Sequence, residues 1–282
     1  MQLYLKKYHI SFIITEAGTL PAYTGSTIEG SFGRALEEIN QKLYGQLNEI
    51  QTDEKNKSFR YTKTNPPRPY IIYPITNGGR KNAGDRLSFE FSLLGKYSTK
   101  FKYLLPIFKN MGKTGFGSHF LKAEFVGVED ILSPITFQSE FNYEDYQGLT
   151  FDKKKLIVNF LSPVSFNSQS RMDYDHGFNE FYKRLYLRFF ILNHLYGDKS
   201  VPDIEHFDYD VDLIENHHKR VDNIYHKSKD KKSYILHGAK LQLRYKADSE
   251  ILDEVYPLVK FGELIHIGAN TVYGFGRYII DS

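Results

Sequence analysis

The sequence predicts an α+β fold in which the order strand, helix, strand, strand, helix, strand occurs twice. Apolar residues that alternate with polar ones mark the strands, and apolar residues three or four positions apart mark amphipathic helices. A helix followed by a glycine-rich loop and a strand also appears once in each half. This order is the ferredoxin-like arrangement, an antiparallel sheet with both helices on one face. We therefore expect two tandem ferredoxin-like βαββαβ domains, residues 1–128 and 153–282, joined by a polar linker over residues 129–152.

The first half supplies every element of this order. Alternation predicts strands in the segments YHISFII and RLSFEFSLL, and a short apolar run between prolines predicts an edge-type strand in PYIIYP. PYIIYP and RLSFEFSLL are expected to pair as a hairpin. Ser26 and Glu29 have the spacing of a capping box, and an apolar stripe from Ile28 to Leu43 predicts a helix that ends at Gly45. A second helix is expected over residues 101–111, and a closing strand in HFLKAEFVGV.

The second half repeats the pattern. Strands are predicted in KKLIVNFLS, YILHGAKLQLRY and TVYGFGRYII. Apolar residues at helical spacing predict a helix from Phe178 to Leu195 that ends at Gly197, and a shorter helix in ILDEVYPLVKFG. The polar stretch from Ser200 to Ser233 is compatible with a strand, a loop or both.

An internal duplication links the two halves. The segment YLLPIFKNMGKTGFGSHFLKAEF is echoed by EVYPLVKFGELIHIGANTVYGFGRYII, and both contain a proline, a glycine and a Gly-Phe-Gly triplet in the same order. The second copy carries the insertion ELIHIGANTVY before its triplet. Self-similarity of this kind indicates that one supersecondary unit occurs twice.

Composition limits the function classes. The chain has 282 residues, 41% of them apolar and 25% charged, which is enough for two modest cores. The absence of cysteine excludes disulfides, thiol catalysis and thiolate metal sites and fits a reducing compartment, so we expect a cytoplasmic location. The net charge of +3 is too small to identify a nucleic-acid partner, but 22 Tyr and 22 Phe offer rings that stack on unpaired bases as well as fill cores.

The two glycine loops are candidate phosphate-binding segments, because glycine lets the backbone approach a phosphate closely and present its N–H groups. Helix caps and tight turns explain the same glycines equally well. Neither loop has the spacing of a nucleotide-binding P-loop. The candidate RNA-binding residues of the loops are Lys113, Gly115, Gly117, Gly268, Asn270, Thr271, Gly274, Gly276 and Arg277.

A basic strip, HHKRVDNIYHKSKDKK, runs from His217 to Lys232. Cations on it neutralise phosphates, and imidazoles act as general acids and bases. Its candidate RNA-binding residues are Lys219, Arg220 and Lys227, and its candidate catalytic residues are His217, His218 and His226. The competing interpretation is a solvated loop.

Metal and hydrolase motifs are missing from the sequence. It has no HExxH, no cysteine ligand and no Gly-x-Ser-x-Gly nucleophile elbow. We therefore expect no metal site and no cofactor.

Several segments together resemble a known family, the CRISPR-associated endoribonucleases that process precursor CRISPR RNA, which form the sixth Cas family within the RAMP superfamily. They are GSTIEGSFGRAL, PPRPYIIYP, LLPIFKNMGKTGFGSHF, LIVNFLSPVSF and, above all, LIHIGANTVYGFGRYII. The last segment resembles the family's C-terminal glycine-rich loop, with His266 in place of the usual leading glycine.

This resemblance implies a pair of ferredoxin-like domains that bind CRISPR repeat RNA and cut it without a metal. The ribose 2′-OH attacks the adjacent phosphate and leaves a 2′,3′-cyclic phosphate. Other Cas proteins of an effector complex and a second copy of the chain are further candidate partners, and no membrane partner is expected.

The family's catalytic histidine cannot be transferred, because no histidine lies between Pro21 and Arg60, where many relatives carry it near the first helix. Two alternatives stay open. In the first, which we favour, a histidine of the basic strip acts with Tyr23, while Arg220 or a lysine steadies the phosphate. In the second, tyrosine, lysine and arginine alone orient the RNA and catalysis is slow, or the protein only binds RNA.

The leading hypothesis from the sequence is a repeat-specific endoribonuclease. Its chief rival is a non-cleaving RAMP subunit that holds guide RNA in an effector complex. A ferredoxin-like pair with no RNA role is a third alternative.

Overall fold

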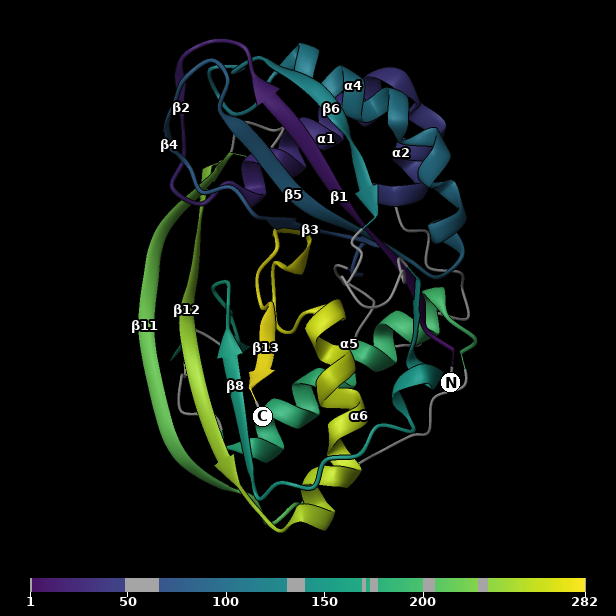
Figure 1. The fold of residues 1–282 in the computed structure, drawn as a ribbon, viewed down its shortest axis with the longest axis vertical. Helices are drawn as coiled ribbons and strands as arrows, with labels where there is room; N and C mark the ends of the chain where they lie inside the picture. The colour runs from purple at the N-terminus through teal and green to yellow at the C-terminus, as the bar shows by residue number, and fades with distance from the viewer. Residues whose placement is uncertain are drawn as a thin grey trace. The chain divides into compact units, whose positions relative to one another are not determined.

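The computed structural model describes residues 2–48, 66–130, 140–168, 171–172, 177–199, 206–227 and 233–281. Contacts divide the chain into two compact units. The N-terminal unit comprises Tyr4–Phe141 and Ile224–Tyr234. The C-terminal unit comprises Met1–Leu3, Asn142–Asn223 and Ile235–Ser282. Figure 1 shows the elements of both units along the chain.

The N-terminal unit contains an antiparallel sheet with the order β3-β5-β1-β6, and β7 also pairs with β1. A second small sheet joins β2 to β4. The elements are β1 (Tyr4–Ile14), β2 (Gly18–Leu20), α1 (Gly25–Ile39), α2 (Gln41–Asn48), β3 (Tyr70–Pro74), β4 (Gly79–Lys81), β5 (Arg86–Leu94), η1 (Gly95–Tyr103), α4 (Leu105–Thr114), β6 (Ala123–Asp130) and β7 (Glu140–Asn142).

Helices α1 and α4 cover the same face of this sheet (Figure 1). The ring of Phe91 on β5 lies 5.0 Å from Phe32 of α1 and 5.4 Å from Phe108 of α4, measured between ring centroids. The three side chains are fully buried. They point into the core because Phe91 is one of the alternate residues of β5 that face the helices, and Phe32 and Phe108 lie on the apolar stripes of their helices.

The first helix differs from its predicted form in two respects. It starts at Gly25, and its N-cap residue Thr24 makes no side-chain capping bond, so the predicted capping box is wrong. The helix also ends at Ile39 instead of reaching Gly45. Asn40 interrupts it and accepts a 2.9 Å hydrogen bond on Oδ1 from the Leu43 amide, which starts α2.

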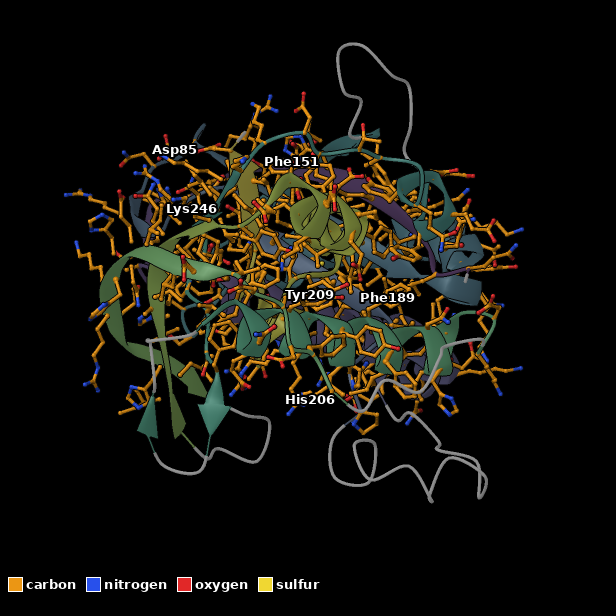
Figure 2. The ribbon with its side chains drawn as sticks, turned by 90° about the horizontal axis from the view of Figure 1, so that it is seen from below. Asp85, Phe151, Phe189, His206, Tyr209 and Lys246 are labelled. Atoms are coloured by element: carbon orange, nitrogen blue, oxygen red, sulfur yellow. The ribbon has the colours of Figure 1, made fainter. Side chains whose placement is uncertain are left out.

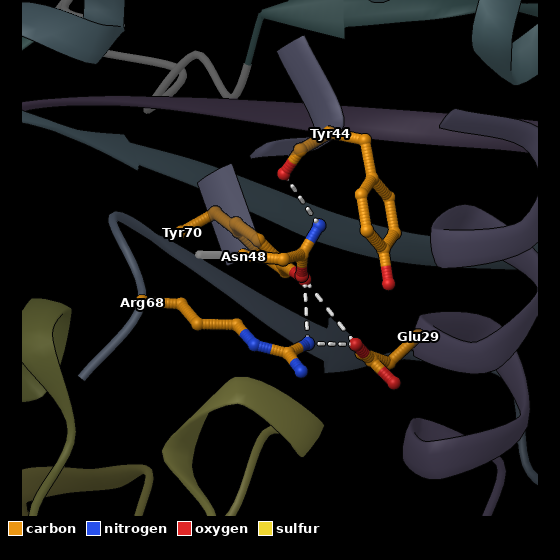
Figure 3. A network of polar contacts seen from close by, with 5 residues as sticks. All are labelled: Glu29, Tyr44, Asn48, Arg68 and Tyr70. Atoms are coloured by element: carbon orange, nitrogen blue, oxygen red, sulfur yellow. Dashed lines mark hydrogen bonds and ion pairs between the residues drawn. The ribbon is translucent and has the colours of Figure 1, made fainter. Parts of the chain in front are cut away.

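Glu29 belongs to a buried polar network that explains why it does not cap the helix (Figure 3). Its carboxylate forms an ion pair with Arg68 and accepts a 3.2 Å hydrogen bond from the Tyr70 hydroxyl. The same hydroxyl accepts a bond from Arg68 and lies 3.0 Å from Oδ1 of Asn48, which in turn donates to the Tyr44 carbonyl. The network ties α1, the end of α2 and β3 together.

The C-terminal unit contains a four-stranded antiparallel sheet with the order β11-β12-β8-β13. Its elements are η2 (Tyr143–Tyr146), β8 (Lys155–Phe160), β9 (Asn167–Ser168), β10 (Arg171–Met172), α5 (Phe178–Tyr196), β11 (Asp212–Lys227), β12 (Ser233–Lys246), α6 (Ser249–Ile265), η3 (Thr271–Tyr273) and β13 (Tyr278–Asp281).

Helices α5 and α6 pack against the sheet of the C-terminal unit and form its core with it. Phe178 and Phe181 of α5 contact Tyr245 of β12 and Tyr278 of β13 at centroid distances of 5.1 and 5.8 Å. The Tyr278 hydroxyl donates a 2.6 Å hydrogen bond to the Val259 carbonyl, which fastens β13 to α6. Figure 2 shows Phe189 on α5 and the exposed His206 at the edge of the unit.

When the four main strands of each unit are numbered 1 to 4 along the chain, both sheets have the order 4-1-3-2 of the ferredoxin-like fold. This order confirms the predicted fold class. Each glycine loop follows the second helix of its unit and leads into the last strand.

Candidate nucleic-acid interface

The basic strip is a strand over the part that the structure describes. Residues 212–227 form β11, so the competing prediction of a loop is wrong for His217, His218, Lys219 and Arg220. These four side chains are exposed, and that of His217 is 69% exposed. Their placement on a strand fixes the direction in which each side chain leaves the backbone.

The pleat of β11 separates the candidate residues into two sets. Glu215 forms an ion pair with Arg244 of β12, and its other oxygen lies 3.6 Å from Nε2 of His217. Because alternate residues of a strand share a face, His217 lies with Glu215, whereas His218 lies with Arg220 on the opposite face. An imidazole beside a guanidinium offers proton transfer and anion stabilisation at one place.

For two candidate residues of the strip, the structure describes the backbone but not the side chain. The backbone of His226 and Lys227 belongs to β11, but their side chains are not described.

Tyr23 lies in the N-terminal unit, two residues before α1, and is partly buried. Burial and, to a lesser extent, the neighbouring Tyr73 raise the pKa of its hydroxyl well above the usual value. The phenol is therefore protonated at neutral pH and acts as a hydrogen-bond donor or an acid, not as a base.

The C-terminal glycine loop has a backbone that depends on left-handed residues. Gly268, Gly274 and Gly276 have φ values of 84°, 84° and 71°, and Asn270 has a φ of 62°. A Cβ atom at Gly276 would lie 1.7 Å from the Ile267 carbonyl oxygen. The glycines are thus required by conformation and close packing.

Internal hydrogen bonds occupy several amides of this loop. The amides of Gly274 and Gly276 donate to the carbonyls of Thr271 and Pro163, at 2.9 and 2.8 Å. Within the described residues, the amides of Asn270, Thr271 and Val272 have no acceptor. Three successive N–H groups of this kind form a favourable environment for an anion.

Thr271 and Arg277 have structural surroundings as well. Thr271 is 7% exposed, and the Arg277 amide donates a 2.9 Å hydrogen bond to the Ser162 hydroxyl. Arg277 is only partly exposed.

His266, which replaces the usual leading glycine, adopts a backbone conformation suited to glycine. It caps α6 with φ 58° and ψ 165°, and its side chain is 2% exposed. Sequence reasoning identified the replacement but not the role of the ring.

In the N-terminal unit, Lys113, Gly115 and Gly117 lie in the equivalent loop after α4. Lys113 is exposed in the last turn of the helix, and Gly115 and Gly117 have φ values of 90° and 73°. A Cβ atom at Gly115 would lie 2.2 Å from the Phe120 carbonyl oxygen, so this glycine permits a close crossing of the chain.

Arg188 on α5 is a residue near the C-terminal glycine loop that sequence reasoning missed. Its Nε and Nη2 donate to the carbonyl of Ile265 at 3.3 Å, at the C-terminal end of α6. Burial lowers the pKa of its guanidinium to about 10, and Tyr196 acts in the opposite direction. The available signal was a cation three residues after Leu185 on the apolar stripe of the helix.

Among the residues that the structure describes, no group of three or more His, Asp or Glu side chains is placed to hold a metal ion. None of the helices in this described part of the chain is long and apolar enough to cross a bilayer.

Comparison with protein families identifies both halves of the chain. Residues 158–278 match the family described as the CRISPR-associated endoribonuclease Cas6. Residues 3–145 match the AF_1859 N-terminal domain family. The Cas6 match covers the C-terminal part of the chain and, with the structural likeness described next, supports a CRISPR-associated protein of the Cas6 type. This result confirms the resemblance seen in the sequence.

Solved Cas6 structures share the fold. A Cas6 protein from Thermus thermophilus superposes with a TM-score of 0.61 at 13% identity, over 99% of each chain. A Cas6-related protein from Pyrococcus furiosus gives a TM-score of 0.53 at 14% identity, also over 99% of each chain. In sequence, the chain is 23% identical to an uncharacterised protein of Archaeoglobus fulgidus, over 100% of this chain and 96% of that protein.

Proposed function

We propose that this Cas6-type protein binds CRISPR repeat RNA and cuts precursor CRISPR RNA by attack of a ribose 2′-OH, without a metal ion. RNA processing is supported by the match of residues 158–278 to the Cas6 family and by the shared fold of a solved Cas6 product complex. The face of β11 that carries His218 and Arg220 is the observation on which the catalytic assignment depends.

The chemistry requires three groups, and the chain has candidates for each. A base removes the proton of the 2′-OH, an acid protonates the departing 5′-oxygen, and a cation stabilises the charged phosphorane. His218 serves as the base and Arg220 as the cation in this proposal. Tyr23, kept protonated by its raised pKa, serves as the acid. His217 and His226 are the alternative bases.

RNA binding is assigned to the same residues that the sequence singled out, with roles refined by geometry. The unpaired amides of Asn270 and Thr271 bind a phosphate, and Gly268, Gly274 and Gly276 hold the loop in the shape that presents them. Further residues contact the sugar-phosphate backbone of the RNA in this proposal. They are Lys219 and Lys227 of β11, Arg277 beside the loop, and Lys113, Gly115 and Gly117 in the N-terminal unit. We place the protein in the cytoplasm.

Protein partners are proposed from a structural likeness. A solved complex named Cas6-RT-Cas1–Cas2 contains a chain with this fold, at a TM-score of 0.64 and 9% identity, although our chain spans only 46% of it. Other Cas proteins and a second copy of the chain are the partners that we propose.

Cleavage of repeat RNA in EDTA tests this function. The substrate is 5′-labelled repeat RNA transcribed from the CRISPR array of the source genome. A single cut that leaves a phosphatase-resistant, acid-labile 3′ end supports the mechanism. A 2′-deoxy nucleotide at the cut position should abolish cleavage and preserve binding. RNA that is bound and stays intact would instead support the non-cleaving RAMP subunit.

Separate alanine substitutions assign the base. We expect His218→Ala to lower the single-turnover rate by about 10²- to 10⁴-fold, the usual contribution of a general base. The exposed His206, outside the strip, provides a matched control that should cut at the normal rate. Normal rates in all of His217→Ala, His218→Ala and His226→Ala would exclude a histidine of the strip as the base.

A further inference from the structure

The Gly-Phe-Gly triplet of the N-terminal unit forms a short hairpin, which we call the 116–121 hairpin. Phe116 and Leu121 exchange two backbone hydrogen bonds of 2.9 Å, and the tip between them consists of residues 117–120. Phe116 is buried in the core, so the base of the hairpin is fixed while its tip is exposed.

Phe120 at this tip combines two unusual properties. Its side chain is 50% exposed, and its backbone has a φ of 54°. A large side chain in the left-handed region is rare, and such strain concentrates at binding sites because it is kept only where the surrounding structure enforces it. Here the close crossing at Gly115 enforces it, because the Phe120 carbonyl packs against that glycine.

Arg34 of α1 is held against the exposed ring. Its guanidinium carbon lies 5.4 Å from the centroid of Phe120. Nη2 donates to the Ser31 hydroxyl at 3.0 Å and to the Gly115 carbonyl at 3.2 Å, and Ser31 donates to the same carbonyl at 3.1 Å. The cation is therefore fixed beside the ring before any ligand binds.

The surroundings of the tip favour an anion. Lys113 is exposed, and Lys122 extends its Nζ to the carbonyls of Lys113 and Thr114 at 2.8 and 3.2 Å. Glu16 provides a nearby carboxylate, which accepts a 3.0 Å hydrogen bond from the Lys122 amide. Glu29 also acts electrostatically on Arg34, so the three cations Arg34, Lys113 and Lys122 stand against two carboxylates.

The tip also presents free donors. Among the residues that the structure describes, the amides of Gly117, Ser118 and His119 have no acceptor. The C-terminal loop likewise presents three successive unpaired amides, at residues 270–272. The two sets are not equivalent by sequence, because residues 270–272 belong to the insertion before the C-terminal triplet, whereas residues 117–119 begin at the last glycine of the N-terminal triplet.

We propose that the 116–121 hairpin is a second RNA-binding site, where an unpaired base stacks on Phe120 and the adjoining phosphate contacts Arg34 and the tip amides. The proposal rests on the proposed function of the chain in RNA binding. A single strand is specified because bases in a duplex do not offer their faces to an exposed ring.

The absence of tryptophan from the chain makes a direct test available. Phe120→Trp places the only indole at the tip. We expect oligoadenylate RNA of 12 nucleotides to quench its emission saturably, and an abasic RNA of the same length to leave it unchanged. Val126→Trp, on β6 of the same unit and 54% exposed, is the matched control and should not respond.

Binding measurements provide the second test. We expect Phe120→Ala and Phe120→Leu to raise the Kd for the fluorescein-labelled 12-mer by about 10-fold, since stacking on one ring has an effect of this order. Phe120→Leu keeps an apolar side chain without the ring. RNA that binds Phe120→Leu as tightly as the wild type, or that binds Phe120→Trp without quenching, would overturn the site. A protein that does not bind the 12-mer at all would also overturn it.

The outcome is separable from that of the cleavage assay. Quenching in a protein that cuts no repeat RNA would support the hairpin site and contradict the proposed nuclease. Normal cleavage without quenching would contradict the hairpin site alone. Quenching by a peptide instead of RNA would reassign the tip to a protein partner and refute the proposal.

Discussion

Nδ1 of His266 lies 3.1 Å from the carbonyl oxygen of Phe275, so the ring bridges the two ends of the C-terminal glycine loop. The residue has φ 58° and ψ 165°, a conformation that is almost confined to glycine. His266 is buried, so this contact lies in the interior of the unit.

Two substitutions of His266 distinguish the effect of its ring contact on stability from the effect of its backbone conformation. His266→Gly removes both the strain and the ring contact, whereas His266→Ala removes the contact and keeps the strain. We expect His266→Ala to have a free energy of unfolding about 1–2 kcal/mol lower than His266→Gly. Urea unfolding of both variants measures the difference. Equal stabilities would show that the positive φ carries no cost here.

Glycine to alanine substitutions should have opposite signs at two positions. Gly276→Ala places a Cβ against the Ile267 carbonyl at a φ of 71°, so we expect a loss of at least about 2 kcal/mol. Gly33→Ala in α1 meets nothing within 4 Å and should stabilise by about 0.5–1 kcal/mol. Thermal unfolding checks both, and a neutral Gly276→Ala would contradict the close packing of the loop.

The network around Glu29 predicts an asymmetric mutational response. Arg68→Met leaves the buried carboxylate without its cation, and we expect a loss of about 1–3 kcal/mol, reduced because the Arg68 side chain is 31% exposed. Arg68→Met combined with Glu29→Leu should recover much of that loss. Arg80→Met, at an exposed position on β4, is the control. Chemical denaturation measures each value, and an additive double variant would mean that the pair does not interact.

His194 predicts a pH dependence of stability. Burial, and then the charge of Lys199, lower the pKa of this imidazole in the folded protein below its usual value of 6.5. At pH values between the lowered pKa and 6.5, the His194 imidazole binds more protons in the unfolded chain than in the folded protein. Its contribution to the free energy of unfolding therefore falls as the pH drops below 6.5 and does not change above that pH.

His194→Gln should therefore lessen the fall in Tm between pH 7.5 and 5. The expected change is small, roughly 1 °C, because the side chain is only partly buried. His206→Gln, at an exposed position, is the control. A Tm profile of His194→Gln that matches the wild type would refute the assignment.

Local patterns in the sequence determined the two ferredoxin-like units. Alternation in β1 and β5 and the helical stripe around Phe32 fix which side chains are able to face a core, and the repeated Gly-Phe-Gly placed the loops. Those signals depend only on near neighbours in the chain, so they could be recognised without the structure. The interruption of the first helix at Asn40 could not be recognised in this way, because the apolar stripe continues past Asn40 while its side chain caps the start of a new helix.

Only the tertiary structure decided what the candidate groups do. The basic strip became a strand, and its pleat placed His218 with Arg220 and His217 with Glu215. A hydrogen bond to the distant Pro163 carbonyl occupied the amide of Gly276, and Arg34 contacts Phe120, which lies far from it in the sequence. Contacts of this kind follow from where folded elements pack against one another, which residue spacing along the chain does not encode.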